Sequence, residues 1–240
     1  MKIIRSKTKS SNIIQITTLD ERWYERVDKG EYYPSVTWIA HYYPKGKGFE
    51  NWLASKGIEE AEAVKMAAGE KGSRVHRACE DLTLGNTVTM ESVYQDNDGN
   101  NKELSVEEWE AIVSFYNFWQ AQKPKLIQSE QVVFNDEYKY AGTMDMLLEI
   151  DGVRWVVDLK TSKSVYPSHE IQVSAYKRCL EDQDVRLAIL QVGYSRNRQG
   201  WKWNEVEDCF PLFLATRSIW EYENKGVSPK QKDYPFSLTL

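Results

Sequence analysis

Cysteine is scarce in this chain, and its spacing excludes several kinds of site. Cys79, Cys179 and Cys209 are the three cysteines among 240 residues, and they lie far apart. Their number is odd and no pair has the two-residue separation of metal-binding cysteines, which argues against a disulfide framework, a zinc ribbon and a four-cysteine iron–sulfur site. We therefore expect no iron–sulfur cluster, and we expect the thiols to be buried apolar groups.

Long apolar runs are also missing. No hydrophobic stretch is long enough to cross a bilayer, so no membrane partner is expected. The first residues are basic, but neither an apolar segment nor a small-residue cleavage site follows them, and they do not predict a secretion signal. The expected location is the cytoplasm.

The chain has no excess of positive charge. Its formal net charge of -5 counts against a protein that coats nucleic acid through its whole surface. Any contact with nucleic acid must therefore be local. An acidic total remains compatible with a metal-dependent nuclease, because clustered carboxylates need a cation and that cation supplies part of the charge that meets phosphate.

The composition itself is that of an ordinary folded domain. Hydrophobic residues make up 41% and charged residues 28% of the chain, and no repeat or low-complexity segment interrupts it. A length of 240 residues suffices for one good core. We expect a single domain over residues 1–240, in which 31–122 form a largely helical N-terminal part and 128–195 form the core.

The N-terminal part has a helical pattern with two interruptions. Apolar residues recur at helical spacing over 49–84, but Gly69 and Gly72 break the pattern. We therefore expect a helix only from about Ser73 to the glycine at its end. The polar segment 95–102 is rich in Asp, Asn and Gly, which is typical of a surface loop.

The remaining elements follow from caps, turns and periodicity. Ser105 and Glu108 fit a capping box, so a buried helix is expected from there to about Gln122. The other expected elements are strands at 13–17, 22–27, 130–135, 140–150, 153–160, 185–194 and 200–206, and helices at 168–181 and 212–223.

A two-residue turn at 151–152 sets the register of the central hairpin. Asp-Gly is a strong signal for such a turn, and counting outward from it places Asp145 opposite Asp158. Opposed carboxylates repel each other unless a shared proton or a cation neutralises them. Lys160 projects on the same face. Oxygen ligands of this kind suit Mg²⁺ or Mn²⁺.

The two faces of this hairpin differ in polarity. One face is expected to be wholly apolar and to pack on the core. It would carry Met144, Met146, Leu148, Ile150, Val153, Trp155, Val157 and Leu159. The alternative to a metal site on the other face is a surface ribbon with solvated acids and Lys160 as their counter-ion, and a β-bulge would change the register.

Four short segments, read in chain order, match the motifs of one nuclease family. They are Tyr33-Pro34-Ser35-Val36-Thr37 with Trp52 downstream, Gly72 with His76, Gly142-Thr143-Met144-Asp145 with Asp158-Leu159-Lys160, and Gln172 with Tyr176. The set resembles the RecB-type branch of the PD-(D/E)XK superfamily, and is similar to the mitochondrial genome maintenance exonucleases and related phage enzymes. The resemblance covers about residues 32–195. It implies an α/β fold with a restriction-endonuclease-like core, in which helices flank a central mixed sheet.

The resemblance also implies roles for the motif residues. Asp145 and Asp158 would bind Mg²⁺ or Mn²⁺, with His76 as a further ligand and the Leu159 carbonyl in the same shell. Lys160 would orient or deprotonate the attacking water and stabilise charge in the transition state. The iron–sulfur cysteines of some relatives and all helicase motifs are absent from the sequence.

Other candidates have plainer alternatives. Glu80, one helical turn beyond His76, and Glu130 could support the metal or be solvated acids. Gln172 and Tyr176 could contact the phosphate backbone or Lys160, or simply cover a sheet edge. Residues that could contact nucleic acid are the basic Arg74, Arg77, Lys163, Lys177, Arg178, Arg196 and Arg198, and the aromatic Trp38, Tyr42 and Tyr43.

The function implied by the resemblance is a metal-dependent DNA exonuclease. It would act on free ends, including single-stranded ones, and leave 5′-phosphates. A bacterial or phage origin and a role in DNA recombination and repair are implied in the same way. The alternatives are a structure-selective endonuclease with the same fold and an inactive nucleic-acid-binding module.

Overall fold

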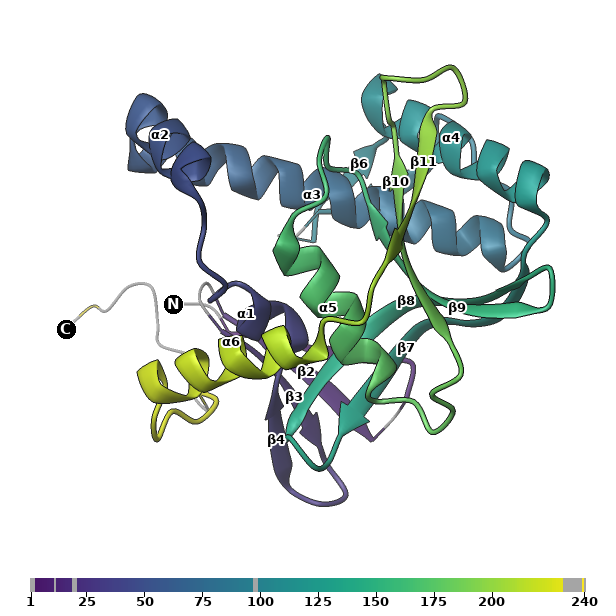
Figure 1. Ribbon diagram of the computed structural model, residues 1–240. Helices are drawn as coiled ribbons and strands as arrows, with labels where there is room; N and C mark the ends of the chain where they lie inside the picture. The colour runs from purple at the N-terminus through teal and green to yellow at the C-terminus, as the bar shows by residue number, and fades with distance from the viewer. Residues whose placement is uncertain (1–2, 11, 19–20, 97–98, 231–238, 240) are drawn as a thin grey trace.

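A mixed sheet with helices on both faces forms the centre of the protein. The computed structural model describes residues 3–10, 12–18, 21–96, 99–230 and 239 (Figure 1). The sheet has five strands in the order β11-β10-β9-β8-β7. Their bounds are β7 Lys125–Asn135, β8 Tyr140–Ile150, β9 Val153–Lys160, β10 Arg186–Val192 and β11 Trp201–Val206. The expectation of an α/β fold with a central mixed sheet is confirmed.

Strand direction changes within this sheet. Strands β7, β8 and β9 are antiparallel neighbours, β9 and β10 are parallel, and β10 and β11 are again antiparallel. Parallel neighbours need a crossover connection, and here helix α5, Pro167–Lys177, supplies it between β9 and β10. Strand β7 begins earlier and α5 ends earlier than expected.

The central hairpin has the predicted turn. Asp151 and Gly152 have φ angles of 51° and 77°, and two positive φ values are the signature of a type I′ turn. The predicted register holds from Ile150 to Met146, which pairs with Val157. Backbone pairing ends there, so the expected cross-strand pair of Asp145 and Asp158 is not formed.

Successive side chains of β8 stop alternating between the two faces of the sheet at Asp145. Met144 packs in the core beneath α5, whereas Met146 packs in the core on the opposite face. The prediction that both share one apolar face is therefore wrong. The adjoining strand is irregular at the same level: β7 pairs with β8 on either side of Glu130, which has a φ of 50°. The register does not shift across Glu130; the register shift of this strand pair, the mark of a β-bulge or irregularity, lies between Leu126 and Gln128.

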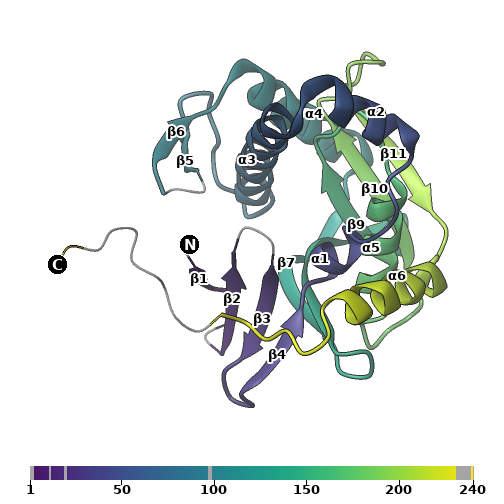
Figure 2. The ribbon, with the colours of Figure 1, turned by 90° about the vertical axis from the view of Figure 1, so that its left-hand side faces the viewer.

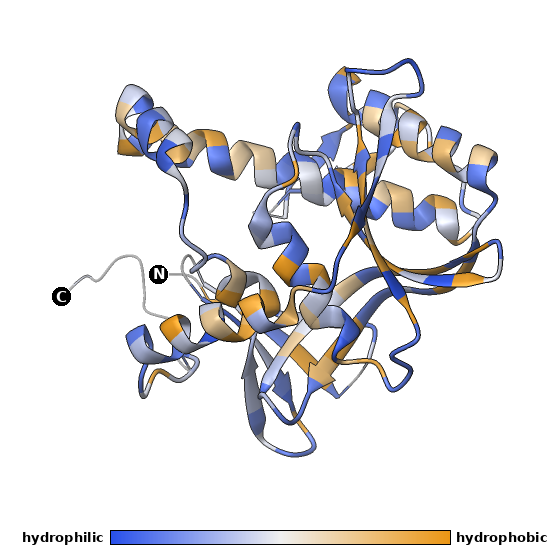
Figure 3. Ribbon diagram, in the orientation of Figure 1, coloured by the Kyte–Doolittle hydropathy of each residue, from blue (hydrophilic) through white to orange (hydrophobic). Residues whose placement is uncertain are grey.

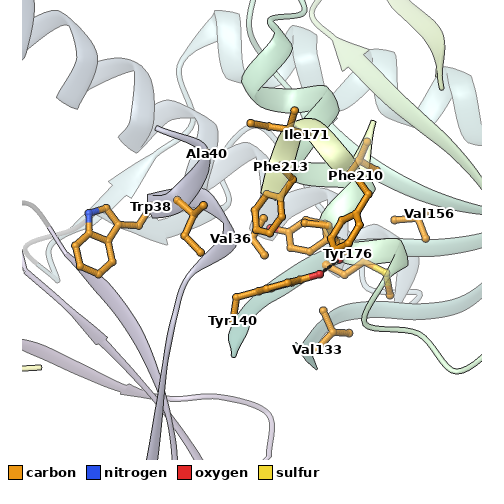
Figure 4. Packing of buried hydrophobic residues seen from close by; sticks show 14 of the residues in the cluster. Val36, Trp38, Ala40, Val133, Tyr140, Val156, Ile171, Tyr176, Phe210 and Phe213 are labelled. Carbon is orange, nitrogen blue, oxygen red and sulfur yellow. Dashed lines mark hydrogen bonds between the residues drawn. The ribbon is translucent and has the colours of Figure 1, made fainter. Parts of the chain in front are cut away.

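Helices α1, α5 and α6 cover one face of the sheet. α1 spans Val36–Ala40 and α6 spans Phe210–Glu223. Their apolar and aromatic side chains pack on apolar residues of the sheet and on Tyr140 of β8 (Figure 4). The rings of Tyr140 and Phe213 lie 4.8 Å apart in an edge-to-face arrangement, and the Tyr140 hydroxyl donates to a carbonyl of α5 over 3.0 Å. This packing fixes α5 against the strands.

Helices α3 and α4 cover the opposite face. α4 spans Val106–Gln122 and begins at the predicted capping box of Ser105 and Glu108. α3 spans Ile58–Thr83 as one helix of 26 residues. The predicted break at Gly69 and Gly72 is wrong, because the cost of a helical glycine, about 1 kcal/mol, is offset where the later turns of α3 pack against α4.

The start of α3 projects beyond the sheet together with α2, Lys47–Lys56. Figure 1 shows both at one side of the molecule, and Figure 3 shows that polar and apolar residues alternate along them. Between α3 and α4, strands β5, Val93–Gln95, and β6, Asn101–Glu103, form a small hairpin where a loop was expected. Residues 97 and 98 of that expected loop lie outside the described residues.

A second sheet is formed by the N-terminal segment. It has four strands in sequence order, and the two strands expected at 13–17 and 22–27 are present as an antiparallel pair. The strands are β1 Ile4–Lys7, β2 Ile13–Thr17, β3 Arg22–Arg26 and β4 Glu31–Pro34. Tyr24 and Tyr33 pack with Ala141 of β8, which places this sheet beside β7 and β8 (Figure 2). Within the described residues, no helix has the length and apolar character needed to cross a membrane.

Candidate active site

Three potential metal ligands come together from three different elements. His76 lies on α3, Glu130 on β7 and Asp145 on β8. Each offers a ligand atom, and these atoms all lie within 4.8 Å of one another. His76 Nδ1 is 3.6 Å from Asp145 Oδ1. An imidazole nitrogen with two carboxylates is a donor set that suits Mn²⁺ or Mg²⁺.

Asp145 is held in place by main chain. Its Oδ2 accepts a hydrogen bond from the Leu159 N–H over 2.7 Å. Burial alone would raise the pKa of Asp145, but His76 and Lys160 outweigh burial and lower it. The pKa of His76 is raised, because the attraction of Asp145 outweighs the burial that would lower it. Asp145 is therefore a charged carboxylate at neutral pH.

Glu130 points into the same group from an unusual backbone conformation. Its φ of 50° is rare for a residue other than glycine, and such conformations cost about 1–3 kcal/mol and cluster at functional sites. Burial, followed by the negative charge of Asp145, raises the pKa of Glu130 to about 8. A carboxyl group in this setting takes up either a proton or a cation.

A small cavity lies between these side chains. Its volume of about 10 Å³ is space for one particle of the size of a water molecule. The residues that line it are His76, Cys79, Glu80, Thr83, Ser129, Glu130, Asp145, Met146 and Leu159. The donor set, the raised pKa of Glu130 and the size of the cavity fit a single metal ion.

Asp158 and Lys160 form a second group next to the first. Lys160 Nζ is 2.6 Å from Asp158 Oδ2, and this oxygen has no hydrogen bond besides the ion pair. Asp158 is only 1% exposed, and burial raises its pKa to about 6 against the influence of Lys160. Burial would lower the pKa of Lys160, but Asp158 and Asp145 outweigh it, so the pKa is raised and the ammonium stays charged.

The ligand group therefore differs from the expected one. Among the described residues, Glu130 joins His76 and Asp145, whereas Asp158 is directed to Lys160. Leu159 lines the cavity, and the contact that it makes with Asp145 is through its N–H. The sequence indicated Glu130 only as possible support, because nothing in it signals the positive φ.

Gln172 and Tyr176 on α5 are turned toward Asp158. Gln172 Nε2 donates to Asp158 Oδ1 over 3.1 Å and to the Tyr176 hydroxyl over 2.9 Å. Both side chains are buried, and burial raises the pKa of Tyr176. The Tyr176 ring lies against Gly142, where an added Cβ would be 2.5 Å from Cε1. Gln172 thus positions Asp158, and contact of Gln172 and Tyr176 with phosphate stays a prediction.

Several of the basic candidates form ion pairs or hydrogen bonds with other residues of the chain. Arg74 is an ion-pair partner of buried Glu108, with Nη2 2.7 Å from Oε1. Arg77 donates to a carbonyl of β5, and Lys177 and Arg178 pair with an aspartate. Lys163, Arg196 and Arg198 are exposed to solvent, as are Arg77 and Arg178. Contact of these exposed residues with phosphate stays a prediction.

The aromatic candidates are largely in the core. Trp38 is buried, and its ring packs edge-on against Trp23 and Trp220 at 5.2 and 5.0 Å. Tyr42 and Tyr43 are partly buried beside the same cluster. The expectation of base stacking is therefore contradicted for Trp38, because its faces are occupied by other rings.

Glu80 has a partner that the sequence did not suggest. It lines the cavity one turn beyond His76, as expected, and its Oε1 forms an ion pair with Lys9. Lys9 comes from the N-terminal sheet, far away in the sequence. No local pattern around Lys9 could have indicated this contact.

Comparison with known proteins adds little. No known family model matches the chain, and no similar protein is found among curated proteins. Among solved structures, the chain is similar to the crystal structure of an alkaline exonuclease from Laribacter hongkongensis, with a TM-score of 0.40 and 10% identity over 79% of this chain and 86% of that chain. This likeness is too weak to support an inference about function.

Proposed function

We propose that the chain is a divalent-metal-dependent deoxyribonuclease of the PD-(D/E)XK fold and its RecB-type branch. It hydrolyses phosphodiesters from free DNA ends, including single-stranded ones, and leaves 5′-phosphates. One observation carries the proposal. His76, Glu130 and Asp145 converge within ligand distance, and the ion pair of Asp158 and Lys160 lies directly beside them.

The three convergent side chains would hold the metal. Glu130 and Asp145 supply oxygens, and His76 supplies a nitrogen, which favours Mn²⁺ as well as Mg²⁺. When bound, such an ion lowers the pKa of a coordinated water and neutralises charge on phosphate. The ion would also supply local positive charge for phosphate in a chain whose formal net charge is -5.

Lys160 supplies a fixed positive charge beside the metal group. Its pKa is raised, so at neutral pH it acts as a hydrogen-bond donor that orients water and stabilises negative charge on the transferring phosphoryl group. Asp158 holds the ammonium in place, and Gln172 in turn holds Asp158. These three residues form one chain of contacts that runs from α5 to the reacting groups.

DNA would approach past α3 and the exposed basic residues. Helix α3 carries His76 and extends beyond the sheet (Figure 1), so DNA that reaches the metal group would run along it. Lys163 follows β9 and is exposed. Local positive charge of this kind meets phosphate without making the whole surface basic.

End-labelled linear DNA, single- and double-stranded, tests the proposal in Mn²⁺, Mg²⁺ and EDTA. The wild type is expected to release 5′-phosphorylated products only with metal. The double variant Lys160→Met/Asp158→Asn removes both charges together, and cleavage is expected to fall by roughly 10²–10³-fold, as when a charge-stabilising group is lost. Exposed Lys225 offers a control, Lys225→Met. Undiminished cleavage by the double variant refutes the proposal.

The same assay separates the alternative functions. A covalently closed circular DNA has no ends, so its cleavage identifies an endonuclease. DNA binding without cleavage, together with no heat of Mn²⁺ binding in calorimetry, identifies an inactive binding module.

A further inference from the structure

Lys9 connects the two walls of the metal cavity. It follows β1 in the N-terminal sheet, and its Nζ forms an ion pair with Glu80 Oε1 of α3. The same Nζ donates a hydrogen bond to the Ser129 carbonyl of β7 over 3.0 Å. Glu80 and Ser129 both line the cavity. The Lys9 ammonium group, which comes from the N-terminal segment, therefore lies at the edge of the ligand group.

The charges around the cavity call for more than one cation. Glu80, Glu130 and Asp145 are three carboxyl groups along one cavity, and among the described residues that line it His76 is the single basic side chain. Three ionised carboxylates are balanced by three positive charges, which a divalent ion and an ammonium group together supply. Lys9 is close enough to Glu130 to lower its pKa, whereas Glu80 raises it.

Glu80 forms an ion pair with Lys9 and is not one of the convergent metal ligands. It lies one helical turn from His76, yet the convergent ligand atoms are those of His76, Glu130 and Asp145. A second ion would lie about 3.5–4 Å from the first and would need carboxylate oxygens of its own.

We propose that Lys9 is a built-in counter-cation that occupies Glu80 and limits the centre to one divalent ion. This inference rests on the proposed metal site. Lys9 is a positioning residue here, because it acts on the centre through Glu80 and through the β7 main chain. The lysine takes the place that a second metal ion would otherwise fill.

The test is the number of Mn²⁺ ions bound, measured by calorimetry and by electron paramagnetic resonance. The wild type is expected to bind one ion. Lys9→Met frees Glu80, and two ions are expected. The double variant Lys9→Met/Glu80→Gln is expected to return to one. Lys9 has a side chain that is 54% exposed, so its replacement leaves the core intact, which circular dichroism verifies.

A matched control comes from the same segment. Lys7 is an exposed residue at the end of β1, and Lys7→Met is expected to bind one ion like the wild type. One ion in the Lys9→Met variant, or two in the wild type, overturns the inference and leaves the proposed metal site standing. No Mn²⁺ bound by the wild type overturns both.

A second readout needs no metal. In EDTA, the Lys9→Met variant leaves Glu80 without its cation beside Glu130, so its melting temperature is expected to lie below those of the wild type and of Lys7→Met. Mn²⁺ is expected to raise the melting temperature of Lys9→Met more than that of either. Equal melting temperatures in EDTA contradict the counter-cation role.

Discussion

Gln172 donates the N–H of its side-chain amide to Asp158 Oδ1 over 3.1 Å. The contact joins helix α5 to strand β9 at the point where Asp158 holds Lys160. Because Asp158 is buried, it has no water to replace a lost donor. The orientation of Lys160 therefore depends on a residue that does not itself face the metal group.

Replacement of Gln172 by methionine tests this dependence. Gln172→Met keeps the volume but removes the donor, so we expect a fall of about tenfold in kcat, an unchanged KM and a loss of about 1 kcal/mol in stability. Steady-state cleavage rates and urea unfolding measure these changes. Gln131→Met, on the exposed part of β7, is the control. An unchanged kcat would show that Asp158 needs no support from α5.

The pH dependence of stability follows from Glu130. Its pKa is about 8 in the folded protein against an ordinary value of 4.5. Between these values the folded protein keeps a proton that the unfolded chain has released. In EDTA, the wild type is therefore expected to lose stability as pH rises from 4.5 to 8, by an amount on the order of 3 kcal/mol.

The variant Glu130→Gln cannot lose a proton at this position. Its free energy of unfolding in EDTA is expected to change less over the same pH range, and above pH 8 it is expected to be the more stable protein. Denaturant unfolding at several pH values measures the difference. If the free energies of unfolding of the two proteins changed with pH in parallel, the pKa of Glu130 would not be raised in the folded protein.

Two glycine replacements are expected to have opposite effects. Gly142→Ala places a Cβ 2.5 Å from the buried Tyr176 ring, so we expect a loss of about 1–3 kcal/mol from overpacking. At Gly69, inside α3, a Cβ meets no atom within 4 Å, and Gly69→Ala is expected to add about 0.5–1 kcal/mol. Thermal melts of both variants give the comparison. A stable Gly142→Ala protein would contradict the close contact.

Arg74 is expected to affect stability rather than DNA affinity. Arg74→Met leaves Glu108, which is 2% exposed, without its partner, and breaking such a buried pair costs about 3–5 kcal/mol. The double variant Arg74→Met/Glu108→Gln is expected to recover part of this loss. DNA affinity of the folded variant, measured by fluorescence anisotropy, should match the wild type; a large loss would restore a role for Arg74 in binding.

Lys163 is expected to behave in the opposite way. It is exposed, so Lys163→Ala should leave the melting temperature unchanged and weaken DNA binding. If Lys163 contacts one phosphate, its loss should reduce the steepness of the plot of log binding constant against log salt concentration by about 1. Lys225→Ala serves as the control. Identical slopes for the wild type and Lys163→Ala would remove Lys163 from the DNA-contacting set.

Local signals predicted local structure well. The Asp151-Gly152 turn and the capping box of Ser105 and Glu108 depend on neighbours in the chain, and both are present. The register that follows from the turn is correct as far as Met146. His76 and Asp145 were also brought together as the motif order suggested.

Features that depend on distant packing were not predictable. The φ of 50° at Glu130 occurs opposite Asp145 of the neighbouring strand, where the alternation of side chains between the two faces is lost. Gly69 remains helical because the later turns of α3 pack against α4 and hold the helix in place. Lys9 reaches Glu80 only through the position of the N-terminal sheet. Each of these is set by segments that are remote in sequence.

The parallel pairing of β9 and β10 determines when the site can assemble on the ribosome. Asp158 and Lys160 on β9 have Ile189 and Gln191 of β10 as neighbours in the sheet. Since synthesis runs from the N-terminus, a nascent chain acquires both charged residues before the strand that flanks them. The edge of β9 stays open until α5 and β10 have emerged. Ordering of the two charges is thus a late event in biosynthesis, and chains that stop before β10 expose an unpaired strand instead.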